Sequence, residues 1–136
     1  MSTSVYELDV DVYYDDTDFS GVVYHANYLK YMERAREHVL GRAELVRLFQ
    51  EEGQGFVVYK ASLTYKEGAV FGDALVVRSF VTESTPYRIV FSQCVYRKND
   101  DRLMVEGEIH LACVDRQKKL VPLPSAVQKL MPSTFS

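Results

Sequence analysis

A carboxylate, a glycine and a histidine follow one another closely near the start of the chain. Asp18 lies three residues before Gly21, and His25 follows four residues after the glycine. A carboxylate can attack a carbonyl carbon or activate a water molecule, and a glycine lets the backbone approach a ligand closely. The N–H groups that begin a helix can hold the oxyanion that forms when a carbonyl carbon is attacked. The segment contains the groups for this chemistry if a helix begins near His25.

These residues also have structural interpretations when each is considered alone. Aspartate is a preferred residue in turns and at helix N-caps, which would explain Asp18 without any catalysis. His25 alone is typical of a packed or half-exposed residue of a helix. Asp15 and Asp16 lie in the same segment, and we interpret them as turn and solubility residues.

Hydrophobic periodicity predicts the elements that would position this segment. Apolar and polar residues alternate over residues 6–14, which predicts a strand, and residues 15–21 are rich in turn formers. From about His25 the period becomes helical. One apolar stripe of the helix is expected to be buried: Tyr28, Met32, Ala35, Val39, Ala43, Val46 and Phe49. Gly41 costs about 1 kcal/mol relative to alanine inside a helix, so a break is possible there.

Four further strands are predicted after the helix. They are rich in Val, Ile, Phe and Tyr and are separated by turn formers: residues 56–65, 73–82, 88–96 and 103–114. Residues 125–130 are expected to form a short helix. Short turns between consecutive strands indicate an antiparallel sheet, so we predict an α+β fold in a single domain spanning residues 1–136. One helix cannot cover both faces of a five-stranded sheet, which favours assembly with another chain.

Composition and charge exclude several classes of protein. Of the 136 residues, 47 % are hydrophobic and 26 % are charged, as is typical of a folded globular protein. The net charge of −3 argues against nucleic-acid binding, and no apolar run is long enough to span a membrane. The N-terminus lacks the basic start and apolar run of a signal peptide, so we expect a cytoplasmic protein.

Cysteine and histidine usage predicts neither a metal site nor a disulfide. Cys94 and Cys113 lie in apolar runs without CxxC spacing, and we expect both to be reduced core residues. The three histidines, His25, His38 and His110, are too scattered to form a zinc site with them. No cofactor is predicted. No serine lies in a G-x-S-x-G motif, so a serine hydrolase triad is not supported.

The loop and the helix start resemble a known family. Residues 14–18 (YDDTD), 21–28 (GVVYHANY) and 33–36 (ERAR) are similar to the motif of the 4-hydroxybenzoyl-CoA thioesterase family. The closest resemblance is to its subgroup of Tol-Pal-associated acyl-CoA thioesterases. Residues 71–75 (FGDAL) and 121–124 (VPLP) extend the resemblance over nearly the whole chain. It implies the hotdog fold, in which a five-stranded antiparallel sheet wraps a long central helix, and assembly into dimers or homotetramers.

The resemblance also implies roles for individual residues. Asp18 matches the catalytic carboxylate of the family. The backbone N–H at His25 matches the group that polarises the thioester carbonyl, and the His25 side chain is expected to assist catalysis or to position the substrate. Substrate-binding roles are expected for a further set of residues: Gly21, Tyr24, Asn27, Lys66 and Arg88. The last two would contact coenzyme A phosphates. The chain reads KEGA at residues 66–69, where many relatives have a proline-alanine pair.

Glu33 is a second candidate for the catalytic carboxylate. Some hotdog thioesterases use a glutamate from the helix in this role. Glu33 is also spaced for an exposed ion pair with Arg36, or with the neighbours of Glu37, on the helix surface, and we favour that interpretation.

The function predicted from these residues is hydrolysis of acyl-CoA to a free acid and coenzyme A. Whether Asp18 is a nucleophile or a general base stays open, because both roles need the same carboxylate. One alternative is a module that binds acyl-CoA without catalysis, since a fold does not determine a function. Another is a thioesterase that acts on acyl carrier protein. A hotdog dehydratase is the least favoured, because the histidine motif of those relatives is absent.

Overall fold

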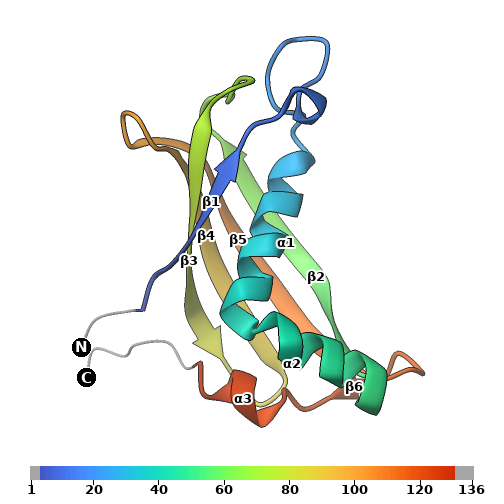
Figure 1. Cartoon of the computed structure of the whole chain (residues 1–136). Coiled ribbons are helices and arrows are strands. Elements are labelled where there is room, and N and C mark those ends of the chain that lie inside the picture. Colours follow the sequence, from blue (N-terminus) through green and yellow to red (C-terminus); the bar gives the residue numbers. More distant parts are fainter. Residues whose placement is uncertain (1–3, 131–136) are drawn as a thin grey trace.

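The computed structural model describes residues 4–130, and its elements follow the predicted order (Figure 1). These residues form eleven elements: β1 (Tyr6–Asp11), the 3-10 helix η1 (Tyr14–Asp16), α1 (Asn27–Leu40), α2 (Arg42–Arg47), the π-helix η2 (Leu48–Glu52), β2 (Gly55–Tyr65), β3 (Ala74–Ser84), β4 (Arg88–Arg97), β5 (Arg102–Val114), β6 (Leu120–Val121) and α3 (Ser125–Gln128). Each predicted strand is present. The helix begins at Asn27, two residues later than predicted.

The strands form one antiparallel sheet in the order β1-β3-β4-β5-β2. The two-residue strand β6 pairs with β5 and adds a sixth strand that was not predicted. Helix α1 lies across one face of this sheet, with β1 and β2 on its two sides (Figure 1). A long helix wrapped by an antiparallel sheet is the hotdog fold, so the predicted α+β class and architecture are confirmed.

The core lies between α1 and the three central strands. The helix contributes Tyr28, Tyr31, Met32 and Ala35, all of which are buried. The sheet contributes alternate residues of its strands: Leu75, Val77, Ile89, Phe91, Val95, Val105, Ile109 and Leu111. Burying one such large side chain stabilises the fold by about 1.5–3 kcal/mol, so this contact determines where the helix sits on the sheet.

Gly41 ends α1 and changes the face that the following residues bury. Its φ angle is +93°, a backbone conformation that favours glycine, and a new helix begins at the next residue. The predicted continuation of one buried stripe past Gly41 is therefore wrong. Val46 and Phe49 are 45 % and 70 % exposed, whereas Leu48 is buried. The break rotates the helical phase, so residues spaced for the first helix no longer face the sheet.

A buried polar network joins α1 to the centre of the sheet. Arg36 donates through Nη1 to Gln93 Oε1 at 2.9 Å. Gln93 Nε2 in turn donates to the Met32 carbonyl and to Ser79 Oγ, both at 2.9 Å. Arg36 is only 6 % exposed, and burial lowers the pKa of its guanidinium. The exposed Glu33–Arg36 ion pair favoured from the sequence is wrong, because Arg36 points into the protein and bonds Gln93 instead.

Both cysteines are free thiols. Cys113 is buried in the core as predicted, whereas Cys94 on β4 is only partly buried. Burial raises the pKa of each thiol, which keeps it protonated at neutral pH. Within residues 4–130, no group of three or more His, Cys, Asp or Glu side chains could hold a metal ion. No helix in that range is long and apolar enough to cross a membrane.

We predict that Gln93→Leu lowers the free energy of unfolding by about 3 kcal/mol, because it leaves the buried Arg36 guanidinium without its acceptor. Urea denaturation monitored by circular dichroism measures this. The double variant Arg36→Met/Gln93→Leu should recover part of the loss, since it removes the charge as well. Gln117→Leu in an exposed turn is the control. Equal stability of Gln93→Leu and the wild type would contradict the role given to this network.

Candidate active site

The segment between β1 and α1 forms a tight loop that ends at the helix. The Gly21 N–H donates to the Asp18 carbonyl at 3.0 Å and closes a turn over Phe19 and Ser20. Gly21 adopts a φ angle of +87°, which a side chain would strain, although no atom lies within 4 Å of the place a Cβ would occupy. The turn therefore explains the glycine, and its predicted contact with substrate stays a prediction.

Backbone hydrogen bonds hold the two arms of the loop together. The Asp18 N–H donates to the Val22 carbonyl at 3.0 Å, and the Tyr24 N–H donates to the Asp16 carbonyl at 2.9 Å. The Asn27 side chain donates through Nδ2 to the same Asp16 carbonyl, also at 2.9 Å. Asn27, predicted to bind substrate, thus ties the first turn of α1 to the loop that carries Asp18.

The Asp18 carboxylate is held by the residue two positions further along. Oδ1 accepts hydrogen bonds from the Ser20 backbone N–H, at 2.9 Å, and from the Ser20 hydroxyl. No residue in the described range donates to Oδ2. The two Ser20 bonds and the nearby His25 lower the pKa of Asp18, so it is ionised at neutral pH. An ionised carboxylate with an uncommitted oxygen can serve as nucleophile or as general base.

The start of α1 presents backbone donors beside this loop. No atom of residues 4–130 accepts a hydrogen bond from the N–H groups of His25 and Ala26. Ala26 occupies the N-cap position and provides no side-chain cap, and both donors lie before the helical N–H groups that a cap would bond. The Asn27 N–H donates to the Tyr24 carbonyl at 2.8 Å. Because C=O and N–H point in opposite directions across a trans peptide, this bond directs the His25 N–H away from the helix.

Three tyrosine rings and the His25 ring lie close together at the helix start. The exposed His25 ring lies 4.5 Å from the Tyr24 ring and 6.3 Å from the Tyr65 ring, measured between centroids. Tyr28 is buried, and its hydroxyl accepts a hydrogen bond from the Ala69 N–H at 3.1 Å. His25 also helps to lower the Asp18 pKa, and the catalytic role predicted for its side chain stays a prediction.

Comparison with known proteins identifies the family. Residues 12–131 match the model of the thioesterase-like superfamily. The chain belongs to this superfamily. It is 34 % identical to the acyl-CoA thioester hydrolase YbgC of Escherichia coli O6:H1, over 93 % of this chain and 96 % of the relative. It is 36 % identical to the acyl-CoA thioesterase YbgC of Haemophilus influenzae, over 94 % of this chain and 95 % of the relative.

Solved structures of thioesterases share the fold. A probable thioesterase from Bartonella henselae superposes with a TM-score of 0.83 at 27 % identity, over 89 % of this chain and all of the other. Slr0204 from Synechocystis, a 1,4-dihydroxy-2-naphthoyl-CoA thioesterase, superposes with a TM-score of 0.85 at 24 % identity, over 93 % of this chain and 95 % of the other. The predicted family and the predicted enzyme class, a thioester hydrolase, are confirmed.

The two basic residues predicted to bind the nucleotide lie far apart in this thioesterase. Lys66 follows β2 at the end near His25, and its Nζ lies 3.7 Å from Glu106. Arg88 pairs in register with Ala112, which in turn pairs with Val57 near the opposite end of β2. The nine residue steps from position 57 to position 66 span about 30 Å in an extended strand. One protomer therefore cannot bring both side chains to one nucleotide, and their roles stay predictions.

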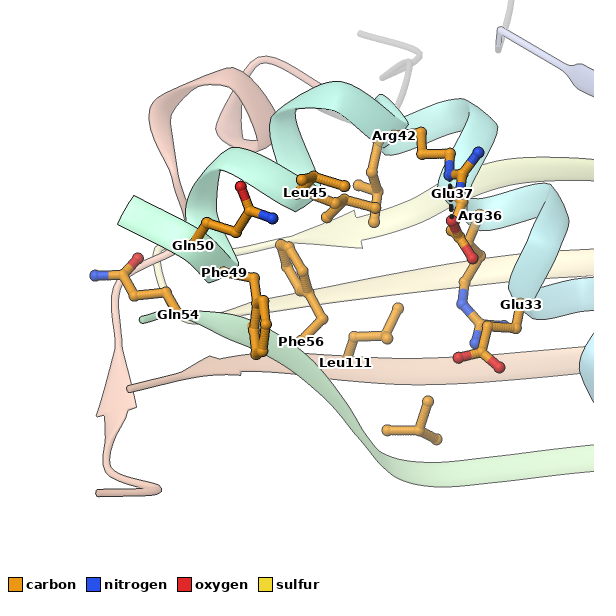
Figure 2. A pocket seen from close by; sticks show the side chains of 14 residues that line it. Glu33, Arg36, Glu37, Arg42, Leu45, Phe49, Gln50, Gln54, Phe56 and Leu111 are labelled. Carbon is orange, nitrogen blue, oxygen red and sulfur yellow. Dashed lines mark ion pairs between the residues drawn. The ribbon is translucent and has the colours of Figure 1, made fainter. Parts of the chain in front are cut away.

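A cleft of about 490 Å³ opens at the other end of α1, and sequence reasoning missed it (Figure 2). Its apolar walls come from the helices and from β2, and they include Leu45, Phe49 and Phe56. Glu33 and Arg36 line its polar end (Figure 2). The sequence feature that could have predicted this cleft is the apolar side chains after Gly41. Val46 and Phe49 line the cleft, whereas the sequence pattern placed them in the core.

We predict that Ser20→Ala moves the acid limb of the kcat/KM profile to higher pH. The Ser20 hydroxyl lowers the Asp18 pKa because it stabilises the carboxylate. Removing this hydroxyl raises the Asp18 pKa, so Asp18 becomes protonated at a less acidic pH. Initial rates between pH 4 and 9 measure the shift. Thr85→Ala, in a distant turn, is the control. An acid limb that does not move would show that Asp18 is not the group being titrated.

Proposed function

We propose that this thioesterase hydrolyses acyl-CoA to a free acid and coenzyme A, with Asp18 as the catalytic carboxylate. The observation that carries the proposal is the ionised Asp18, with one uncommitted oxygen, in the loop that leads into an uncapped helix start. The relatives named acyl-CoA thioesterases cover nearly the full length of the chain and support the substrate class.

The proposed reaction assigns one task to each group. The thioester carbonyl oxygen accepts a hydrogen bond from the His25 N–H and gains negative charge as its carbon is attacked. As a general base, Asp18 takes a proton from water, and the hydroxide adds to the carbon. The C–S bond then breaks, and the thiolate takes the proton back from Asp18. As a nucleophile, Asp18 would form an acyl anhydride as the thiolate leaves. Water would then hydrolyse the anhydride and regenerate the Asp18 carboxylate, and the thiolate would take up a proton released in this step.

The Asp18 hypothesis predicts that Asp18→Asn lowers kcat on acyl-CoA by about 10³-fold or more, because an amide can neither attack nor accept the proton. Thiol release from a panel of esters, from acetyl-CoA to palmitoyl-CoA with benzoyl-CoA and hydroxybenzoyl-CoA, measures this. Asp15→Asn, in the same loop, is the matched control and should keep its activity. Near-normal turnover by Asp18→Asn would overturn the assignment of the carboxylate.

The same panel separates the alternatives. If the wild type releases no thiol from any ester, calorimetry with the same esters tests for binding without catalysis. The enzyme could instead hydrolyse acyl carrier protein thioesters and leave acyl-CoA intact. That result would replace coenzyme A by the carrier protein in the proposal and would leave the proposed hydrolysis mechanism unchanged.

A homo-oligomer is also part of the proposal, and β2 is its expected interface. This strand is eleven residues long and lies at one edge of the sheet, with residues 57–62 exposed. The opposite edge, β1, has six residues, and its Glu7 and Asp9 form ion pairs with Arg78 and Lys98. Charged, short edges resist pairing, whereas a long edge with apolar residues favours it. Pairing two copies through β2 would satisfy its unpaired backbone groups.

We predict a solution mass of two or four chains of 15.6 kDa each, measured by size-exclusion chromatography with light scattering. Ala61→Lys should shift the protein towards monomer, since it places a charge on both paired edges. Gln117→Lys adds the same charge in a turn away from β2 and should not change the mass. A monomeric wild type at micromolar concentration would contradict the proposed assembly.

A further inference from the structure

A tyrosine from the edge strand holds the carbonyl of His25. Tyr65 is the last residue of β2, and its hydroxyl donates to the His25 carbonyl oxygen at 3.0 Å. Among residues 4–130, it is the only donor recorded for that carbonyl, since the helical bonds of α1 begin after it. The contact joins residues that lie forty positions apart in the sequence. It therefore ties the start of the helix to the far edge of the sheet.

This contact determines the orientation of one peptide plane at the helix start. In a trans peptide, the N–H of the next residue points opposite to the carbonyl. Holding the His25 carbonyl on Tyr65 therefore directs the Ala26 N–H to the other side. The preceding plane is held separately, because the Tyr24 carbonyl accepts from the Asn27 N–H at 2.8 Å and so directs the His25 N–H. Two consecutive donors without partners in the described chain are thus oriented by bonds to their carbonyls.

The Tyr65 ring is itself held in place. It packs edge-on against Tyr28 with a centroid distance of 5.8 Å, and against His25 at 6.3 Å. The Tyr28 hydroxyl is in turn bonded by the Ala69 N–H, so the ring that supports Tyr65 is anchored at both ends. Partial burial raises the pKa of the Tyr65 phenol, which keeps its proton available for donation at neutral pH.

We propose that Tyr65 is a positioning residue for thioester hydrolysis, whose hydroxyl holds the His25–Ala26 peptide so that the Ala26 N–H meets the developing oxyanion beside the His25 N–H. The proposal rests on the proposed function. Donors that are oriented before the reaction stabilise the transition state, and a displacement of about 1 Å can cost a factor of about 10² in rate. Tyr65 acts through the backbone and does not touch the reacting atoms.

The test compares Tyr65→Phe with Tyr59→Phe, since each variant loses a single hydroxyl. Both tyrosines belong to β2 and are similarly exposed, at 46 % and 47 %. Tyr65→Phe should lower kcat on the best acyl-CoA of the panel by about ten- to a hundredfold, with KM within about twofold of the wild type. Tyr59→Phe removes only the 3.4 Å contact between its hydroxyl and Arg88 and should leave kcat unchanged. Thermal unfolding of both variants checks that the fold is intact.

A second measurement reports on the backbone without any turnover. Hydrogen exchange and ¹⁵N relaxation of the Ala26 amide should show a more mobile peptide in Tyr65→Phe than in the wild type or in Tyr59→Phe. An unchanged kcat in Tyr65→Phe, or an unchanged Ala26 amide, would overturn the positioning role while leaving Asp18 catalysis intact. A rise in KM at constant kcat would also overturn it, because Tyr65 would then bind substrate. A wild type without thioesterase activity would instead overturn the proposed function.

Discussion

The packing of α1 against the central strands is the contact on which the rest of the structure depends. Tyr28, Met32 and Ala35 bury one face of the helix on the sheet. This burial places the N-terminus of the helix next to the loop that follows β1, which carries Asp18. It also places the same N-terminus within reach of the end of β2, where Tyr65 bonds His25. The candidate site is assembled from three segments because the core fixes their relative positions.

The helix start has no side-chain cap, and the two N–H groups just before it have no partner in the described part of the chain. A serine, threonine or aspartate at the N-cap would stabilise the helix by about 1 kcal/mol relative to the alanine found there. Such a cap would bond the N–H of Tyr28 or Leu29, so the His25 and Ala26 N–H groups lie before the donors that it would occupy. The chain orients the His25 and Ala26 N–H groups through the carbonyls of Tyr24 and His25. These two N–H groups stay free to bind a ligand, and the bonds to the two carbonyls hold their peptide planes in place.

Much of the fold follows from the sequence alone. The strand boundaries agree with the structure within about two residues, except at the end of the first strand, because alternation and turn formers are local signals. The break at Gly41 also follows from one residue type. Residues 14–36 carried the family resemblance, and with it the enzyme class, since a dense motif does not depend on knowing the contacts around it. The catalytic roles of Asp18 and His25 stay predictions, which measurements of turnover test.

Other features depend on contacts between residues distant in sequence, which no local pattern encodes. The burial of Arg36 is one, because the helical pattern placed it on the surface and only Gln93, fifty-seven residues away, gives it a buried partner. The exposure of Val46 and Phe49 is another, since the phase after Gly41 depends on the angle between two helices. The sequence pattern predicted only that Tyr65 belongs to a strand. The tertiary structure shows that its hydroxyl bonds the His25 carbonyl. The sequence by itself determined the elements and the family, and the tertiary structure decided which side chains hold the helix start.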